Sequence, residues 1–194
     1  MSLRNFFILA LVFIAQLDLA FAEERSSWSV GAYWGKSNQA DILELTRARF
    51  EKWESYSILG LTARKDLWKV PGYFAFEWHN HLVFHFEKWG LIEGVEALSF
   101  TWKWFPWSRW VSSSLAFGDG VSVASDYPSS ESVEQKIYTR LMNYLVCEFR
   151  AEVPGAPEFE LLLKVHHRSA VYGLIQDFRG GSNYVSAGMM WRLP

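Results

Sequence analysis

Strict alternation of apolar and polar side chains, one residue after the other, limits the structures this chain can adopt. The run 159–169 reads FELLLKVHHRS. A β-strand displays alternate residues on opposite faces. One face then carries Phe159, Leu161, Leu163, Val165, His167 and Ser169, and the other carries Glu160, Leu162, Lys164, His166 and Arg168. A soluble sheet buries its apolar face, whereas a membrane barrel turns that face to lipid and keeps the polar face inside.

The strongest alternation lies in residues 73–89. Its apolar face holds Phe74, Phe76, Trp78, Leu82, Phe84 and Phe86, and its polar face holds Glu77, His79, His81, His85 and Glu87. Both faces continue long enough for a tilted strand to cross a bilayer. The pattern therefore favours a strand with its apolar side toward lipid.

The aromatic content also favours a membrane barrel. Phe, Trp and Tyr make up 18% of the 194 residues, including eleven Trp. Aromatic side chains gather in girdles at both interfaces of outer-membrane barrels. An aromatic-rich soluble β-sandwich is the alternative fold.

Nine segments have strand-like patterns, which is one more than an even-numbered barrel accepts. They are 28–35, 42–50, 56–65, 73–89, 94–105, 110–120, 139–152, 159–169 and 183–193. We expect eight of them to span the membrane and one N-terminal candidate to be absorbed elsewhere. The predicted fold is an all-β, antiparallel transmembrane β-barrel of eight strands.

The N-terminus predicts export. Arg4 precedes the apolar run FFILALVFIA, and Ala20-Phe21-Ala22 follows as an Ala-x-Ala cleavage site. This arrangement is typical of a secretory signal peptide, so we assign residues 1–22 to a signal for the Sec pathway. Residues 23–194 then form a single barrel domain in the outer membrane.

The net charge and the cysteine content exclude several other classes of protein. A net charge of −2 does not suit a nucleic-acid binder. The single cysteine, Cys147, excludes an internal disulfide. The imidazoles of His79, His81 and His85 could bind a transition metal, but side chains that line the barrel interior are the better interpretation. We therefore expect no metal and no cofactor. The sequence does not determine the oligomeric state.

His167 and Ser169 are the most unusual polar pair on a lipid-facing strand. The C-terminus of such a barrel lies on the periplasmic side, which places Ser169 at the extracellular rim with Asn183 nearby on the last strand. A nucleophilic serine needs a base within hydrogen-bond reach, and two residues on one strand face can supply both groups. Backbone N–H groups around Gly180 and Gly181 could stabilise an oxyanion. Alternatively, His167 and Ser169 are structural residues of the rim that bind lipid headgroups or the loop backbone.

The sequence His167-x-Ser169 at the end of the penultimate strand, followed by a glycine-containing loop and a short final strand, resembles the lipid A 3-O-deacylase (PagL) family. The resemblance implies an eight-stranded outer-membrane barrel with a serine-esterase site on its outer surface and lipid A, the lipid anchor of lipopolysaccharide, as substrate. It assigns Ser169 as nucleophile and His167 as general base.

Two positions depart from that family. Ala170 stands where the family has Asn, and no carboxylate occupies the start of the last strand, where the family has Glu. Asn183 could orient the imidazole instead, and Asp177 is the nearest acid in the loop.

We therefore carry two functional hypotheses, a lipid A esterase and a non-catalytic barrel with a structural or lipid-binding role. For the esterase, Gly180, Gly181 and Arg168 are candidate substrate-binding residues. Arg168 could bind a lipid A phosphate or join Lys164 and His166 in a network inside the barrel.

Overall fold

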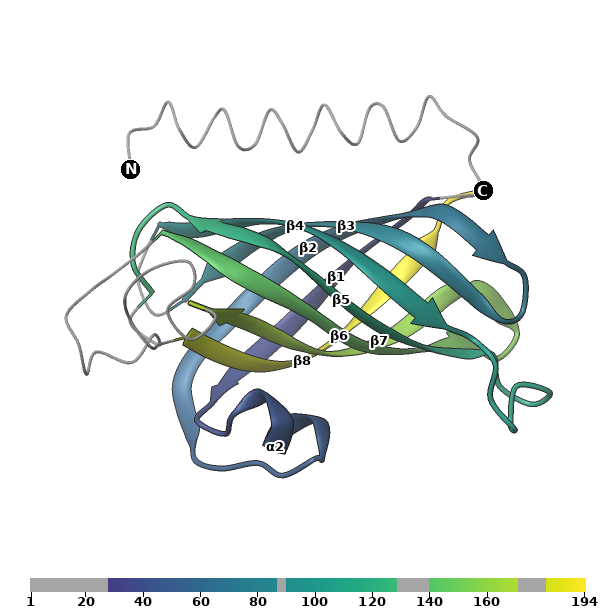
Figure 1. Cartoon of the computed structure of the whole chain (residues 1–194), viewed down its shortest axis with the longest axis horizontal. Helices are drawn as coiled ribbons and strands as arrows, with labels where there is room; N and C mark the ends of the chain where they lie inside the picture. Colours follow the sequence, from purple (N-terminus) through teal and green to yellow (C-terminus); the bar gives the residue numbers. More distant parts are fainter. Residues whose placement is uncertain (1–27, 87–89, 129–139, 171–180) are drawn as a thin grey trace.

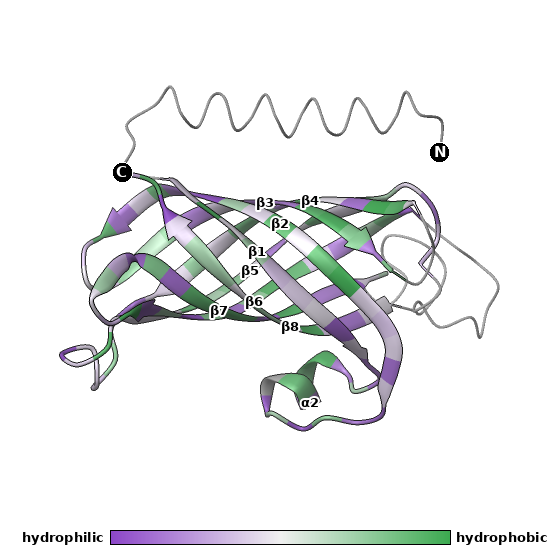
Figure 2. Cartoon of the chain, turned by 180° about the vertical axis from the view of Figure 1, so that it is seen from behind, coloured by the Kyte–Doolittle hydropathy of each residue, from purple (hydrophilic) through white to green (hydrophobic). Residues whose placement is uncertain are grey.

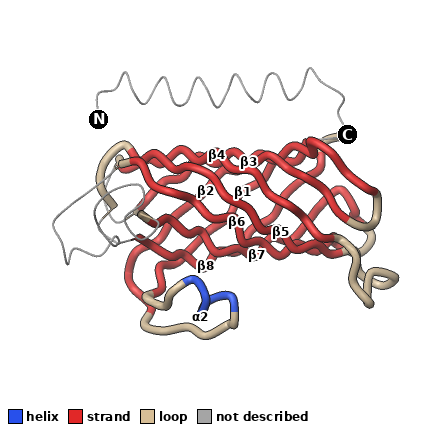
Figure 3. The backbone as a smooth tube through the Cα atoms, in the orientation of Figure 1, coloured by secondary structure: helices blue, strands red, loops and turns tan. Residues whose placement is uncertain are grey.

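The chain forms a closed barrel of eight antiparallel strands in which each strand pairs with the next and β8 pairs with β1 (Figure 1; Figure 3). The computed structural model describes residues 28–86, 90–128, 140–170 and 181–194. The strands are β1 (Trp28–Asn38), β2 (Trp53–Val70), β3 (Phe74–His85), β4 (Leu91–Trp102), β5 (Ser113–Ala124), β6 (Leu141–Val153), β7 (Ala156–Ser169) and β8 (Gly181–Arg192). The predicted fold class and strand number are confirmed. The predicted signal peptide lies outside the described residues.

The alternation along β7 sorts its side chains as the sequence predicts. Leu161 and Leu163 are more than half exposed on the outer wall, whereas Leu162, Lys164 and His166 are buried inside the barrel. Apolar and polar residues alternate along the strands in the same way elsewhere (Figure 2). An outward apolar wall of this kind suits lipid and does not suit water, because exposed apolar surface on this scale is costly in water.

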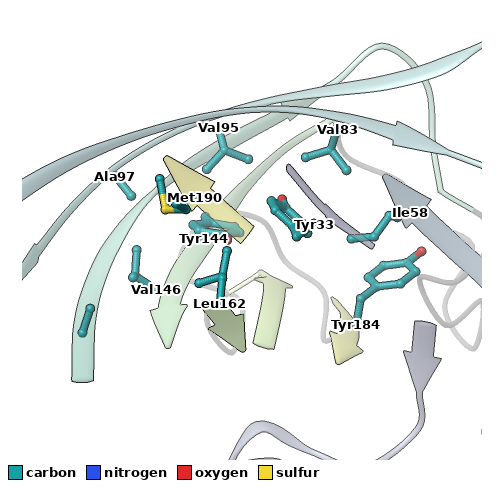
Figure 4. Close-up of a cluster of buried hydrophobic side chains, with 11 residues drawn as sticks. Tyr33, Ile58, Val83, Val95, Ala97, Tyr144, Val146, Leu162, Tyr184 and Met190 are labelled. Atoms are coloured by element: carbon teal, nitrogen blue, oxygen red, sulfur yellow. The ribbon is translucent and has the colours of Figure 1, made fainter. Parts of the chain in front are cut away.

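The interior is filled by side chains. A cluster that includes Tyr33, Tyr144, Tyr184 and Leu162 occupies the lumen (Figure 4). Gly60 is required here, because a Cβ at this position would lie 2.1 Å from the buried Tyr33 ring. An eight-stranded barrel is just wide enough for such filling, so the interior forms a core rather than a channel.

Charged groups in the lumen are paired. Arg150 Nη2 lies 2.8 Å from Glu77 Oε2, and Lys164 Nζ lies 2.8 Å from Glu148 Oε1. Arg64 Nη2 lies 2.8 Å from Glu160 Oε2. Buried charges are tolerated when they are paired and hydrogen-bonded, which explains how polar inward faces can form a core.

One strand prediction is wrong. The segment 42–50 was predicted as a strand, but Ile42–Thr46 forms a short helix, α2, within the β1–β2 connection. Asp41 caps it, because its Oδ1 accepts the Glu44 backbone N–H at 2.9 Å. Ile42 and Leu45, three residues apart, then face the barrel together, which a helix permits and a strand does not.

The helix lies outside the barrel, against the wall formed by β7 and β8 (Figure 1). Leu45 packs with Ala40 and Val165 there. Among the described residues, no helix is long and apolar enough to span a bilayer. Helix α2 is therefore a peripheral element attached to the outer wall.

The two ends of the barrel differ. At one end, here called the terminal end, Trp28 and Leu193 lie together and share a backbone hydrogen bond. Tight turns at Gly72 and Gly155, both with positive φ, join strands at this end. The opposite end, here called the loop end, carries the α2 connection and the end of β7.

Candidate active site

His167 and Ser169 end strand β7 at the loop end and face outward, as predicted. His167 pairs in register with Asn183 on β8, and Ser169 pairs with Gly181. The His167, Ser169 and Asn183 side chains are each partly exposed. The structure thus brings four of the predicted site residues, Gly181 included, to one patch of the outer wall.

A directed chain of hydrogen bonds sets the state of the histidine. Asn183 Nδ2 donates to the backbone carbonyl of Ala40 at 2.9 Å. That contact turns the amide oxygen of Asn183 toward His167, where Oδ1 lies 2.5 Å from Nδ1. Since an amide oxygen only accepts hydrogen bonds, Nδ1 of His167 must carry the proton. In neutral imidazole this leaves Nε2 as the acceptor, which is the state that a general base requires.

The β1–β2 connection holds the Ala40 carbonyl in place. The Ala40 N–H donates to Asn38 Oδ1 at 3.0 Å, and Asn38 Nδ2 donates to the Glu51 carbonyl at 3.1 Å. Ala40 is fully buried beneath Leu45 of α2. Sequence reasoning missed this support, because no local pattern indicates that the connection folds back onto β7 and β8.

The Ser169 side chain is partly exposed on the outer wall. Its partner Gly181 has no side chain, and a Cβ there would lie 2.2 Å from the Arg168 carbonyl oxygen, so only glycine permits this approach of β8. No hydrogen bond joins Ser169 Oγ to His167 in the part of the chain that the structure describes. The two side chains share one strand face two residues apart, and catalytic hydrogen bonds often shorten only when substrate binds.

The other neighbour of Ser169 is Asn143 on β6, its partner in register. Asn143 Nδ2 donates to Asp119 Oδ1 and to the Gly120 carbonyl, the latter at 3.2 Å. The polar patch therefore extends from β8 across β7 and β6 to β5. Sequence reasoning did not single out Asn143 or Asp119, because register between strands was needed to find them.

The remaining predicted residues fall elsewhere. Asp177 and Gly180 lie outside the described residues. Over the described ranges, no carboxylate contacts His167, so Asn183 is the group that orients it. Arg168 requires a correction: it is fully buried in the lumen, where Nε lies 3.5 Å from Glu93 Oε1 and Nη2 donates to the Arg140 carbonyl. Its inward position on the strand does not present it to a lipid phosphate.

A second group of potential ligands lies in the lumen. One donor atom each from His79, His81 and Glu148 lies within 4.8 Å of the others. Lys164 Nζ stands among them, 2.8 Å from Glu148 Oε1 and 3.4 Å from His81 Nε2. The ammonium group already supplies the positive charge that a metal ion would bring, so this cluster fits a structural ion network inside the barrel.

Solved structures resemble this chain in fold. The crystal structure of the outer membrane enzyme PagL matches with a TM-score of 0.57 and 14% identity, covering 86% of this chain and 99% of PagL. The crystal structure of Neisserial surface protein A (NspA) matches with a TM-score of 0.53 and 14% identity, covering 88% of this chain and 100% of NspA. No protein-family model and no curated protein sequence matches the chain. At this identity the likeness concerns the barrel fold alone.

Proposed function

We propose that this chain is an outer-membrane serine esterase that removes an ester-linked acyl chain from lipid A. Ser169 is the nucleophile, His167 is the general base and Asn183 orients His167. The observation that carries the proposal is the chain of hydrogen bonds from Ala40 through Asn183 to His167, which leaves Nε2 free to accept a proton.

The proposed reaction follows from these groups. His167 Nε2 takes the Ser169 hydroxyl proton while Oγ attacks the ester carbonyl carbon, and the imidazolium then gives that proton to the departing sugar oxygen. Water, activated by the same nitrogen, hydrolyses the acyl-serine to release the fatty acid. Backbone N–H groups of the Gly180–Gly181 segment are the proposed oxyanion donors.

Position on the outer wall suits such a substrate. An acyl ester of lipid A lies near the headgroup boundary with its hydrocarbon chain in the bilayer, so it reaches a nucleophile at the barrel rim from the side. The exposed apolar wall of β7 below Ser169, which includes Leu161 and Leu163, would line the acyl chain. We also place the loop end of the barrel outside the cell and its terminal end in the periplasm, following the usual orientation of such barrels.

Mass spectrometry of lipid A from cells that express the chain tests this proposal. Wild-type protein should remove one acyl chain, and Ser169→Ala and His167→Ala should each abolish the loss. Ser55→Ala, an exposed serine of β2, is the matched control and should remain active. Deacylation that persists in the folded Ser169→Ala protein would rule out Ser169 as nucleophile.

A non-catalytic barrel with a structural or lipid-binding role is the second candidate. It is favoured by the missing carboxylate beside His167 in the described chain, because a neutral amide does not stabilise imidazolium by charge. Unchanged lipid A in cells whose outer membrane contains the folded wild-type barrel would select this candidate.

Export is part of the same proposal. If residues 1–22 are a Sec signal peptide, protein isolated from the outer membrane should begin at Glu23. N-terminal sequencing measures this directly, and an N-terminus at Met1 would contradict the assignment.

A further inference from the structure

The connection between β4 and β5 is unusual for its place in the barrel. It joins strands at the terminal end, where such barrels normally have short turns, yet it runs over residues 103–112 with the sequence KWFPWSRWVS. The other two turns at this end are tight. Figure 1 shows the connection projecting beyond the barrel at the end that carries the C-terminus.

This aromatic loop has a defined conformation. The Phe105 N–H donates to Ser108 Oγ at 2.9 Å, and Trp107 Nε1 donates to Ser113 Oγ at 2.9 Å. The Phe105 and Trp107 rings stack with centroids 4.8 Å apart. Its shape is therefore held by its own contacts, and its exposed rings need not rearrange to meet a partner.

The outer surface of the loop is aromatic and cationic. Trp104 and Trp110 are 54% and 66% exposed. The Arg109 guanidinium lies 3.7 Å from the centroid of the Trp110 ring. Within the described residues, no carboxylate forms an ion pair with Arg109. Tryptophan side chains with an adjacent, unpaired arginine are the composition that favours the bilayer interface, where rings lie at headgroup level and cations meet phosphate.

The loop also continues an apolar surface that already faces lipid. Trp102, at the end of β4, is exposed beside Trp104, and its Nε1 donates to the Trp104 carbonyl at 2.5 Å. Phe100 and Phe76 follow on the outer wall, with ring centroids 5.5 Å apart. An aromatic band thus runs from the barrel wall onto the loop without a polar break between them.

We propose that the 103–112 loop is a membrane anchor that lies in the phospholipid headgroup layer at the terminal end, with Trp104 and Trp110 among the headgroups and Arg109 bound to lipid phosphate. The stacking of Arg109 on Trp110 orients the guanidinium while leaving N–H groups for phosphate oxygens. Anionic phospholipid should bind this surface more strongly than zwitterionic phospholipid. The anchor does not depend on the proposed esterase activity.

A single fluorescent label tests the position of the loop. The Val111→Cys variant, made with Cys147→Ser so that one thiol remains, is labelled and refolded as the full chain into phosphatidylcholine vesicles containing phosphatidylglycerol. The label should be quenched by a lipid carrying a spin label at its headgroup and should be protected from iodide in the water. Glu158→Cys, an exposed position at the same end, is the control and should be quenched by iodide.

Two further outcomes decide the chemistry of the partner. Raising the phosphatidylglycerol share should increase headgroup quenching at position 111, and Arg109→Gln should remove that increase; equal behaviour of both proteins would overturn the phosphate contact. A label at 111 that is as open to iodide as the one at 158 would overturn the anchor. Protection by soluble glycan strands in place of lipid would overturn it too, since the loop would then be a carbohydrate-binding surface.

Discussion

At the scale of single residues, the candidate site depends on the direction of one amide. Asn183 could present either its oxygen or its nitrogen to His167, and the Ala40 carbonyl decides between them. The sequence allowed us to predict His167, Ser169 and Asn183 on one face, because alternation along strands is periodic. It did not allow us to predict Ala40, since that contact joins residues far apart in the chain.

Replacing Asn183 tests this arrangement. In Asn183→Ala the imidazole loses the acceptor for Nδ1–H, so the tautomer with Nε2 as base is no longer favoured. Deacylation should fall by roughly 10²-fold, the lower range for general-base catalysis, mainly in kcat. Steady-state kinetics of the refolded barrel on lipid A measures it, with Gln39→Ala as a control. An unchanged kcat would show that Asn183 does not position His167.

At the scale of secondary structure elements, α2 links the β1–β2 connection to the wall of β7 and β8 that carries the candidate site. The alternation of side chains over 42–50 predicts a strand, but Ile42 and Leu45 meet the barrel at helical spacing and Asp41 caps a helix. The eight strands were predictable because each must turn one face to lipid. A five-residue helix has no such constraint from its surroundings, so its type is decided by capping and by the wall it meets.

Two leucines of α2 offer a matched pair of substitutions. Leu45 is buried against the wall, whereas Leu43 is 61% exposed. Leu45→Asn should release the helix from β7 and β8, loosen Ala40 and reduce deacylation severalfold, while the barrel remains folded. Leu43→Asn should leave activity nearly unchanged. Equal activity of the two variants, measured on lipid A with circular dichroism to verify folding, would show that the helix does not support the site.

At the scale of the whole molecule, the lumen is stabilised by a polar network whose members come from distant strands. Glu93 on β4 is its centre: Oε2 lies 2.8 Å from His85 Nε2, and Oε1 lies 3.1 Å from His166 Nε2. Ser122 donates to Glu93 Oε1 at 2.6 Å, and Arg168 lies beside it. Alternation along the strands predicts that the histidines and Arg168 point inward. Their hydrogen-bond and ion-pair partners lie on other strands, so these partners could be identified only once the closed barrel was known.

Removing the charge at the centre of this network should destabilise the barrel. Glu93→Gln replaces the buried carboxylate that Arg168 and His166 contact with a neutral amide, and the free energy of unfolding should fall by about 3 kcal/mol, the range for breaking a buried ion pair. Urea unfolding of the barrel in lipid vesicles measures the difference. Glu51→Gln, at an exposed position of the α2 connection, should have no effect; similar losses in both variants would contradict a special role for Glu93.

The most direct test of the account is covalent labelling of the folded barrel by a serine-reactive fluorophosphonate, with the modified residue located by peptide mass spectrometry. The account predicts that Ser169 of the wild-type protein is modified, that labelling is lost in Ser169→Ala and that it is strongly slowed in His167→Ala. A correctly folded wild-type barrel whose Ser169 remains unmodified, or one that reacts equally well without His167, would contradict the proposal that these residues form an esterase site.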